Sequence, residues 1–138
     1  MKTAKVSVCT MPNRQIRDFN FNIEVSNGRM EHFERPLRPS SHEYLKNIGP
    51  IGTSIVEKLF EIDGIMEVYI HPYQIAVVIA DDFFDWYGRK GVQKQVVAVF
   101  RTVLREYGYI LHPQGELKTN RHKYQTADEK QIVEQADQ

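Results

Sequence analysis

Alternating apolar and polar residues near the N-terminus predict two β-strands that each bury one face. Residues 4–9 and 19–25 carry apolar side chains at every second position, with mainly polar side chains between them. A period of two is the side-chain repeat of a strand. The Asn-Gly pair at 27–28 is a strong hairpin signal, so we expect residues 29–33 to return as a short third strand. Residues 34–47 contain two prolines and two serines and are expected to form a surface connection.

Two later segments repeat apolar residues at the spacing of an α-helix. The first begins at Pro50, because the fixed φ of proline suits the first position of a helix. It ends at Gly64, since glycine tolerates the left-handed conformation found at helix C-termini. The second segment runs from Val92 to Tyr107, and Gly108 ends it.

The residues around these helices predict further strands. Residues 65–70 and 75–80 are expected to form an antiparallel pair, and the second of them carries no charge. An uncharged strand of this kind is typical of the centre of a sheet with helices on one face. Residues 109–111 predict an edge strand. From residue 113 onward the chain is polar and mixed in charge, which predicts a flexible tail.

These elements combine into a single α+β domain over residues 1–112, followed by a polar C-terminal tail over residues 113–138. We expect a mainly antiparallel sheet of four to five strands with two helices packed on one face. A chain of 138 residues is long enough to bury a hydrophobic core of its own.

The segment from Leu59 to Tyr69, LFEIDGIMEVY, followed by IAVV at residues 75–78, resembles the N-terminal domain of Nfu/NifU-type iron–sulfur scaffold proteins. That family has Leu-Phe-x-Ile-x-Gly-Val-x-x-Val-Phe after a helix that starts with a Ser-Pro-Leu-Ala-like sequence, where this chain has Gly-Pro-Ile-Gly at residues 49–52. The resemblance implies an accessory role in iron–sulfur cluster assembly or delivery. The Cys-x-x-Cys motif that binds the cluster in the family belongs to a second domain, and these 138 residues do not contain it.

Charge and cysteine content exclude several classes of function. Eighteen basic and eighteen acidic residues balance, so no overall field attracts nucleic acid or a membrane. The single cysteine, Cys9, cannot form an internal disulfide or a cysteine-rich metal site, and a cluster normally takes four thiolates. We therefore expect no cofactor. Alternation places Cys9 on the strand face opposite Val6 and Val8, which we expect to be open to solvent.

The N-terminal residues lack the apolar core of a signal peptide. No stretch approaches the roughly 20 apolar residues of a membrane span. These two observations predict a cytoplasmic protein that has no membrane partner.

One group of basic residues stands out on the last predicted helix. Lys90, Lys94, Arg101 and Arg105 are spaced so that they follow one face of the helix, opposite its apolar stripe. We call these four residues the basic ridge. It could contact an acidic protein surface or the phosphates of a nucleic acid, and a solvated helix face is the simplest alternative.

Other candidate residues carry weaker signals. Three carboxylates in five residues, Asp81, Asp82 and Asp85, could bind a hard cation. They lack the glycine and distal glutamate of a calcium loop, and we interpret them as complements to the helix dipole. The five histidines show no metal-ligand spacing and are interpreted as loop or surface residues, with His71 beside a predicted hairpin turn: His32, His42, His71, His112 and His122.

The sequence contains no catalytic constellation, so we expect a protein that is not an enzyme. We favour a non-catalytic protein-interaction module, a monomer or weak dimer, whose partners by resemblance are iron–sulfur carrier or client proteins. The alternative is a small nucleic-acid-associated protein that uses the basic ridge. The neutral net charge ranks the protein partner first.

Overall fold

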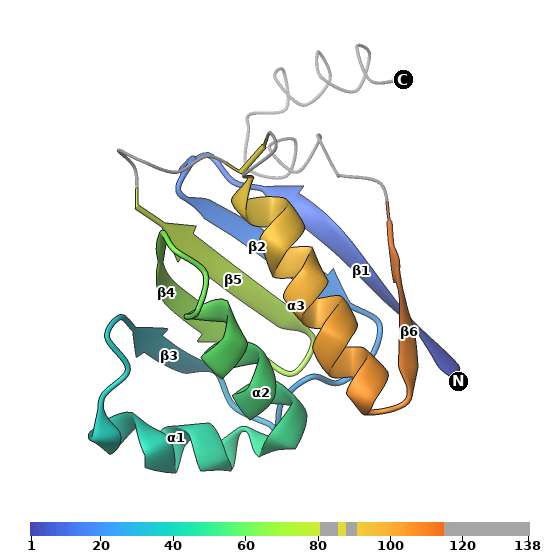
Figure 1. Cartoon of the computed structure of the whole chain (residues 1–138), viewed down its shortest axis with the longest axis horizontal. Coiled ribbons are helices and arrows are strands. Elements are labelled where there is room, and N and C mark those ends of the chain that lie inside the picture. Colours follow the sequence, from blue (N-terminus) through green and yellow to red (C-terminus); the bar gives the residue numbers. More distant parts are fainter. Residues whose placement is uncertain (81–85, 88–90, 115–138) are drawn as a thin grey trace.

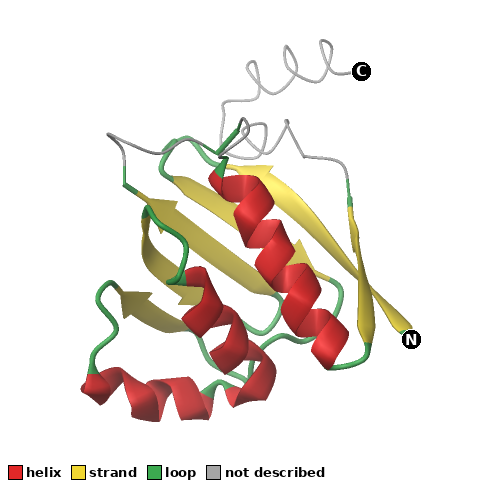
Figure 2. Cartoon of the chain, viewed as in Figure 1, coloured by secondary structure: helices red, strands yellow, loops and turns green. Residues whose placement is uncertain are grey.

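The computed structural model describes residues 1–80, 86–87 and 91–114. These residues form a six-stranded sheet in the order β3-β4-β5-β2-β1-β6. Helices α2 and α3 lie across one face of the sheet, and the short α1 lies beside α2 near β3 (Figures 1 and 2). The strands are β1 (Lys2–Thr10), β2 (Ile16–Phe21), β3 (Glu31–Glu34), β4 (Ile65–Ile70), β5 (Gln74–Ile79) and β6 (Tyr109–Pro113). The helices are the 3₁₀ turn η1 (Pro39–Ser41), α1 (His42–Asn47), α2 (Gly49–Leu59) and α3 (Val92–Glu106).

The predicted α+β class is confirmed, with differences in detail. The sheet has six strands where four to five were expected, and it is mixed, because β1 pairs with β6 in parallel while the other neighbours are antiparallel. As predicted, β5 is a central strand, next to β4 and β2. None of the helices in the described part of the chain is long and apolar enough to cross a membrane.

The predicted hairpin at residues 27–28 is wrong. Strand β3 pairs with β4, whereas β2 lies between β1 and β5. Gly28 does adopt the left-handed conformation of a turn residue, with φ of 58°. The preceding chain, however, has already left the sheet, since the Val25 amide donates to the Pro72 carbonyl and the Asn27 amide donates to the Ile48 carbonyl. The turn therefore carries the chain across the end of the sheet to its far edge.

The connection expected over residues 34–47 contains regular structure. It includes η1 and α1, and α1 buries Leu45, which is 3 % exposed. Ile48, three residues further on, is also buried. Two apolar residues at a spacing of three face the core on one side of a single helical turn. So short a stripe is too weak a pattern to reveal a helix in the sequence.

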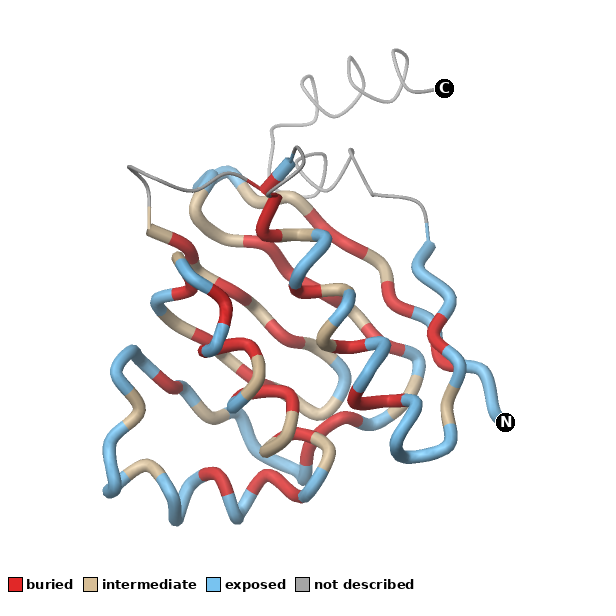
Figure 3. Tube along the Cα trace, in the orientation of Figure 1, coloured by how far each residue is buried: buried red, intermediate tan, exposed pale blue. Residues whose placement is uncertain are grey.

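The core fills the space between the sheet and helices α2 and α3, and Figure 3 shows the exposed positions on the outer sides of these helices. Residues from the end of α2 and from the two interior strands β4 and β5 contribute to it, with Phe60 and Ile62 7 % exposed and Val68 and Val77 fully buried. Arg35 closes the end of α2, because its guanidinium donates hydrogen bonds to the carbonyl oxygens of Phe60, Ile62 and Ile65 at 2.6–2.9 Å. The helix end and the start of β4 are thus held together by one side chain.

Candidate functional site

Helix α3 displays three of the four residues of the basic ridge. Lys94, Arg101 and Arg105 are all exposed, on the side of the helix opposite the buried Val96 and Phe100. At a rise of 1.5 Å per residue, the 11 steps from Lys94 to Arg105 span about 16 Å along the helix axis. Lys90 lies outside the described residues. The structure therefore brings together the part of the ridge that falls within α3.

The electrostatic setting differs at the two ends of this helix. Arg105 lies in the last turn, where a cation complements the partial negative charge of the helix end. Lys94 lies in the first turn, where a cation is disfavoured, and that turn contains no acidic residue. Within the described part of the chain, none of the acidic side chains forms an ion pair with Lys94, Arg101 or Arg105. Within the described residues, the interaction with the helix dipole is favourable for Arg105 and unfavourable for Lys94.

A buried arginine, which the sequence pattern did not single out, positions the start of α3. Arg17 on β2 is only 6 % exposed, and its side chain donates a hydrogen bond to the side-chain oxygen of Gln93 in the first turn of α3. Its guanidinium carbon lies 4.5 Å from the ring centroid of Tyr87 and 5.3 Å from that of Trp86, within the range of a cation–π contact. Trp86 in turn donates to the Arg14 carbonyl at 2.8 Å. These contacts attach the N-terminal end of α3 to the sheet.

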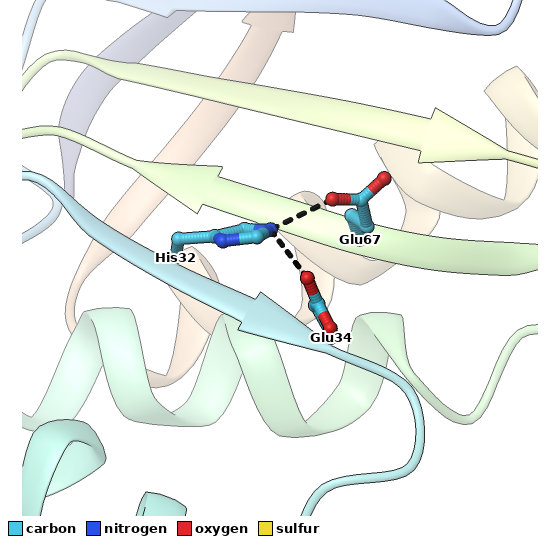
Figure 4. A group of neighbouring side chains, drawn as sticks. All are labelled: His32, Glu34 and Glu67. Atoms are coloured by element: carbon cyan, nitrogen blue, oxygen red, sulfur yellow. Dashed lines mark hydrogen bonds and ion pairs between the residues drawn. The ribbon is translucent and has the colours of Figure 1, made fainter.

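A second group of polar side chains lies on the sheet face opposite the helices, where β3 and β4 run side by side (Figure 4). His32 Nε2 lies 2.8 Å from a carboxylate oxygen of Glu67 and 3.8 Å from one of Glu34. The His32 ring stacks on Tyr69, with centroids 4.1 Å apart and an interplanar angle of 7°. The Tyr69 hydroxyl donates to the same Glu67 oxygen at 3.3 Å. Partial burial, and then the carboxylates of Glu67 and Glu34, raise the pKa of Tyr69 above its usual value.

This group was not predicted from the sequence, where His32 was interpreted as a loop or surface residue. His32 is indeed at the surface, but in a strand, and His32 and Glu34 alternate with the buried Phe33. The His-x-Glu spacing of two was a usable signal that both side chains share one face of a strand. The third member, Glu67, comes from a strand whose pairing with β3 only the fold reveals.

Further along the same face, Asp18 on β2 is buried at 8 % exposure. Burial raises the pKa of this carboxyl, and the charge of His71 together with a hydrogen bond from Gln74 partly offsets the effect. His71 lies in the turn between β4 and β5, as the sequence predicted. The arrangement makes Asp18 a carboxyl whose ionised form is disfavoured in the folded protein.

The prediction that Cys9 is open to solvent is wrong. Cys9 is 4 % exposed and lies directly across from Asp18, and the Asn20 side chain donates to its sulfur at 3.3 Å. Alternation placed Cys9 correctly on the face opposite Val6 and Val8. It could not show whether this face is covered, because burial depends on residues distant in the sequence.

The candidates for cation binding from the sequence, Asp81, Asp82 and Asp85, lie outside the described residues.

Comparison with known proteins supports the α+β fold. No model of a known protein family matches this chain, and no curated protein sequence matches it. Among solved structures, protein SAV1430 from Staphylococcus aureus is similar, with a TM-score of 0.50 and 18 % sequence identity. The similarity covers 70 % of this chain and 98 % of that protein. At this level of identity the likeness supports the shared α+β fold.

Proposed function

We propose that this protein is a non-catalytic interaction module that binds an acidic protein surface through the basic ridge of α3. The observation that carries the proposal is Lys94, an exposed cation in the first turn of α3 with no acidic residue beside it in that turn. A cation in this place weakens the helix by a few tenths of a kcal/mol up to about 1 kcal/mol. Contact with an external anionic surface explains why it is there.

The partner class follows from the resemblance to the N-terminal domain of Nfu/NifU-type proteins. We propose that the acidic partners are carrier or client proteins of iron–sulfur cluster assembly or delivery. The module would then bring proteins together without itself holding a cluster. The anchoring of α3 by Arg17 and Phe100 holds the three ridge residues on this helix, Lys94, Arg101 and Arg105, in a fixed geometry, which reduces the entropy cost of binding.

The test is a charge reversal with a matched control. In one variant Lys94, Arg101 and Arg105 are changed to Glu, and in the control the exposed Arg29, Arg38 and Lys46 are changed to Glu. Both variants lose the same net charge, so only the position of the change differs. Binding to purified iron–sulfur carrier and scaffold proteins of the source organism is measured by calorimetry.

We expect the ridge variant to lose binding and the control to retain most of it. Folding should be intact in both, because exposed charges typically contribute less than about 1 kcal/mol. If both variants lose the same amount of binding affinity, the effect is due to net charge and not to the position of the charges. If the ridge variant binds as tightly as the wild type, α3 is not part of the interface. If the wild type binds none of these proteins, the proposed partner class is wrong. The ridge could then still be tested against other acidic proteins.

The alternative function, association with nucleic acid, rests on the same three cations. Contacts from three cations to phosphates would give a slope of about −3 in a plot of log affinity against log salt concentration for duplex DNA. We rank this alternative second because the formal net charge of the chain is zero and provides no long-range attraction to a polyanion. Submicromolar, salt-sensitive oligonucleotide binding that the ridge variant loses would reverse the ranking.

A further inference from the structure

We propose that His32, Glu34 and Glu67 form a binding site for a divalent transition-metal ion such as zinc, on the sheet face opposite the helices. One imidazole nitrogen and two carboxylate oxygens, all within 4.8 Å of one another, converge there from two adjacent strands. The site is separate from the basic ridge and does not depend on it. Figure 4 shows the three side chains pointing toward one another.

The distances fit coordination with small side-chain adjustments. Zinc–nitrogen and zinc–oxygen bonds of about 2.0–2.2 Å, at angles between octahedral and tetrahedral, place two ligand atoms about 2.9–3.5 Å apart. The separations from His32 Nε2 to the Glu67 and Glu34 oxygens, 2.8 and 3.8 Å, lie just outside the two ends of this range. The side chains of His32 and Glu67 are about one-third exposed and that of Glu34 is 69 % exposed, so an ion and its remaining water ligands have access.

Neighbouring groups hold two of the three ligands in place. Stacking on Tyr69 fixes the plane of the His32 ring and directs Nε2 toward the carboxylates. The hydrogen bond from the Tyr69 hydroxyl orients the Glu67 carboxylate. Partners of this kind orient the ligands in known metal sites and account for a large part of their affinity.

The register of β3 and β4 provides an independent argument. Glu34 and Glu67 lie directly opposite each other across the two strands. Like charges in this position are destabilising by up to about 1 kcal/mol, and β3 is an edge strand that could carry other residues there. A bound divalent cation would convert this repulsion into attraction. The competing explanation is that His32 only forms a hydrogen bond with Glu67 and no ion binds.

The ligand set selects the class of metal. Calcium and magnesium take oxygen ligands almost entirely, whereas a mixed imidazole and carboxylate set suits zinc and its first-row neighbours. Three protein ligands leave at least one coordination position for water. The site is therefore of the open type.

The test uses the full chain without an affinity tag, titrated calorimetrically with zinc chloride and, for comparison, magnesium chloride. His32→Phe removes the ligand nitrogen but keeps a planar ring on Tyr69. Glu67→Gln removes the charge but keeps an acceptor for the Tyr69 hydroxyl. His112→Phe changes another exposed histidine, on β6, and serves as the matched control.

We expect one zinc ion per chain with a dissociation constant in the micromolar range and no comparable magnesium binding. His32→Phe and Glu67→Gln should each weaken zinc binding at least about tenfold, since even indirect partners contribute 10- to 100-fold. The control should bind as the wild type does. Zinc should also raise the thermal midpoint of the wild type and leave that of His32→Phe unchanged.

Two results would overturn the proposal. One is the absence of zinc binding by the wild type at concentrations up to about 1 mM, which would leave the hydrogen bond between His32 and Glu67 as the whole role of this group. The other is zinc binding of unchanged affinity in both His32→Phe and Glu67→Gln. Circular dichroism spectra of all variants exclude unfolding as the cause of a loss.

Discussion

Phe100 is the side chain through which α3, the helix that carries the basic ridge, is packed against the sheet. It is fully buried, and its ring meets Phe19 and Phe21 edge to face, with centroids 5.2 and 5.0 Å apart. Replacing a buried phenylalanine by alanine costs about 3–5 kcal/mol in free energy of unfolding. Two aromatic pairs of about 0.5–1.5 kcal/mol each place Phe100→Ala at the upper end of this range. That is a large share of the 5–15 kcal/mol by which a typical domain is stable.

The variant Phe100→Leu separates the contribution of the aromatic pairs to the free energy of unfolding from the contribution of the buried side-chain volume. Leucine keeps most of the apolar volume and loses both aromatic pairs, so we expect a cost of about 1–2 kcal/mol. The control is Thr102→Ala, an exposed position on the same helix, which should stay within about 0.5 kcal/mol of the wild type.

Urea unfolding at equilibrium measures all three variants, with the fluorescence of the single, buried Trp86 as the signal. The slope of free energy against urea should be unchanged if only native-state packing is affected. A loss below about 1.5 kcal/mol for Phe100→Ala would show that α3 is not held by this contact. Equal losses for the alanine and leucine variants would show that the aromatic pairs, and not the filled volume, dominate.

Three further predictions concern the buried residues Asp18 and Cys9. Because burial raises the pKa of Asp18 in the folded chain above that in the unfolded chain, the folded protein takes up this proton at the higher pH. The free energy of unfolding of the wild type, relative to that of Asp18→Asn, should therefore rise as the pH is lowered from about 7 to about 4. A constant difference between the urea midpoints of the two proteins across this pH interval would contradict the raised pKa of Asp18. The buried Cys9 thiol should react with an aromatic disulfide reagent far more slowly in the folded protein than in urea. Anaerobic treatment with iron and sulfide should yield no stoichiometric cluster, since one thiolate cannot replace the usual four; a visible spectrum that disappears in Cys9→Ser would disprove this.

Local periodicity was sufficient for the elements that build the core. The helical repeat of α3, the Pro50 start of α2 and the uncharged run of β5 all predicted structure within a few residues of the observed bounds. The predicted stop at Gly64 was too late, because α2 ends at Leu59 and Gly64, with φ of 95°, directly precedes β4. Each of these signals lies within one element, because a strand or helix must place its apolar side chains on one face wherever it packs. The face of α3 that carries Lys94, Arg101 and Arg105 was predictable for the same reason.

Relations between elements were decided only by the tertiary structure. The turn at Gly28 was read correctly, but the strand after it pairs with β4, and the choice between edges of the sheet is made by contacts more than 30 residues apart. The burial of Cys9 and Asp18 likewise depends on what covers that part of the sheet. The group of His32, Glu34 and Glu67 arises from a strand register. A pattern along the chain shows which face of a strand or helix a residue lies on. Its neighbours across the sheet are set by the free energy of the whole packed domain. The proposed metal site depends on such neighbours and therefore could not be predicted from the sequence.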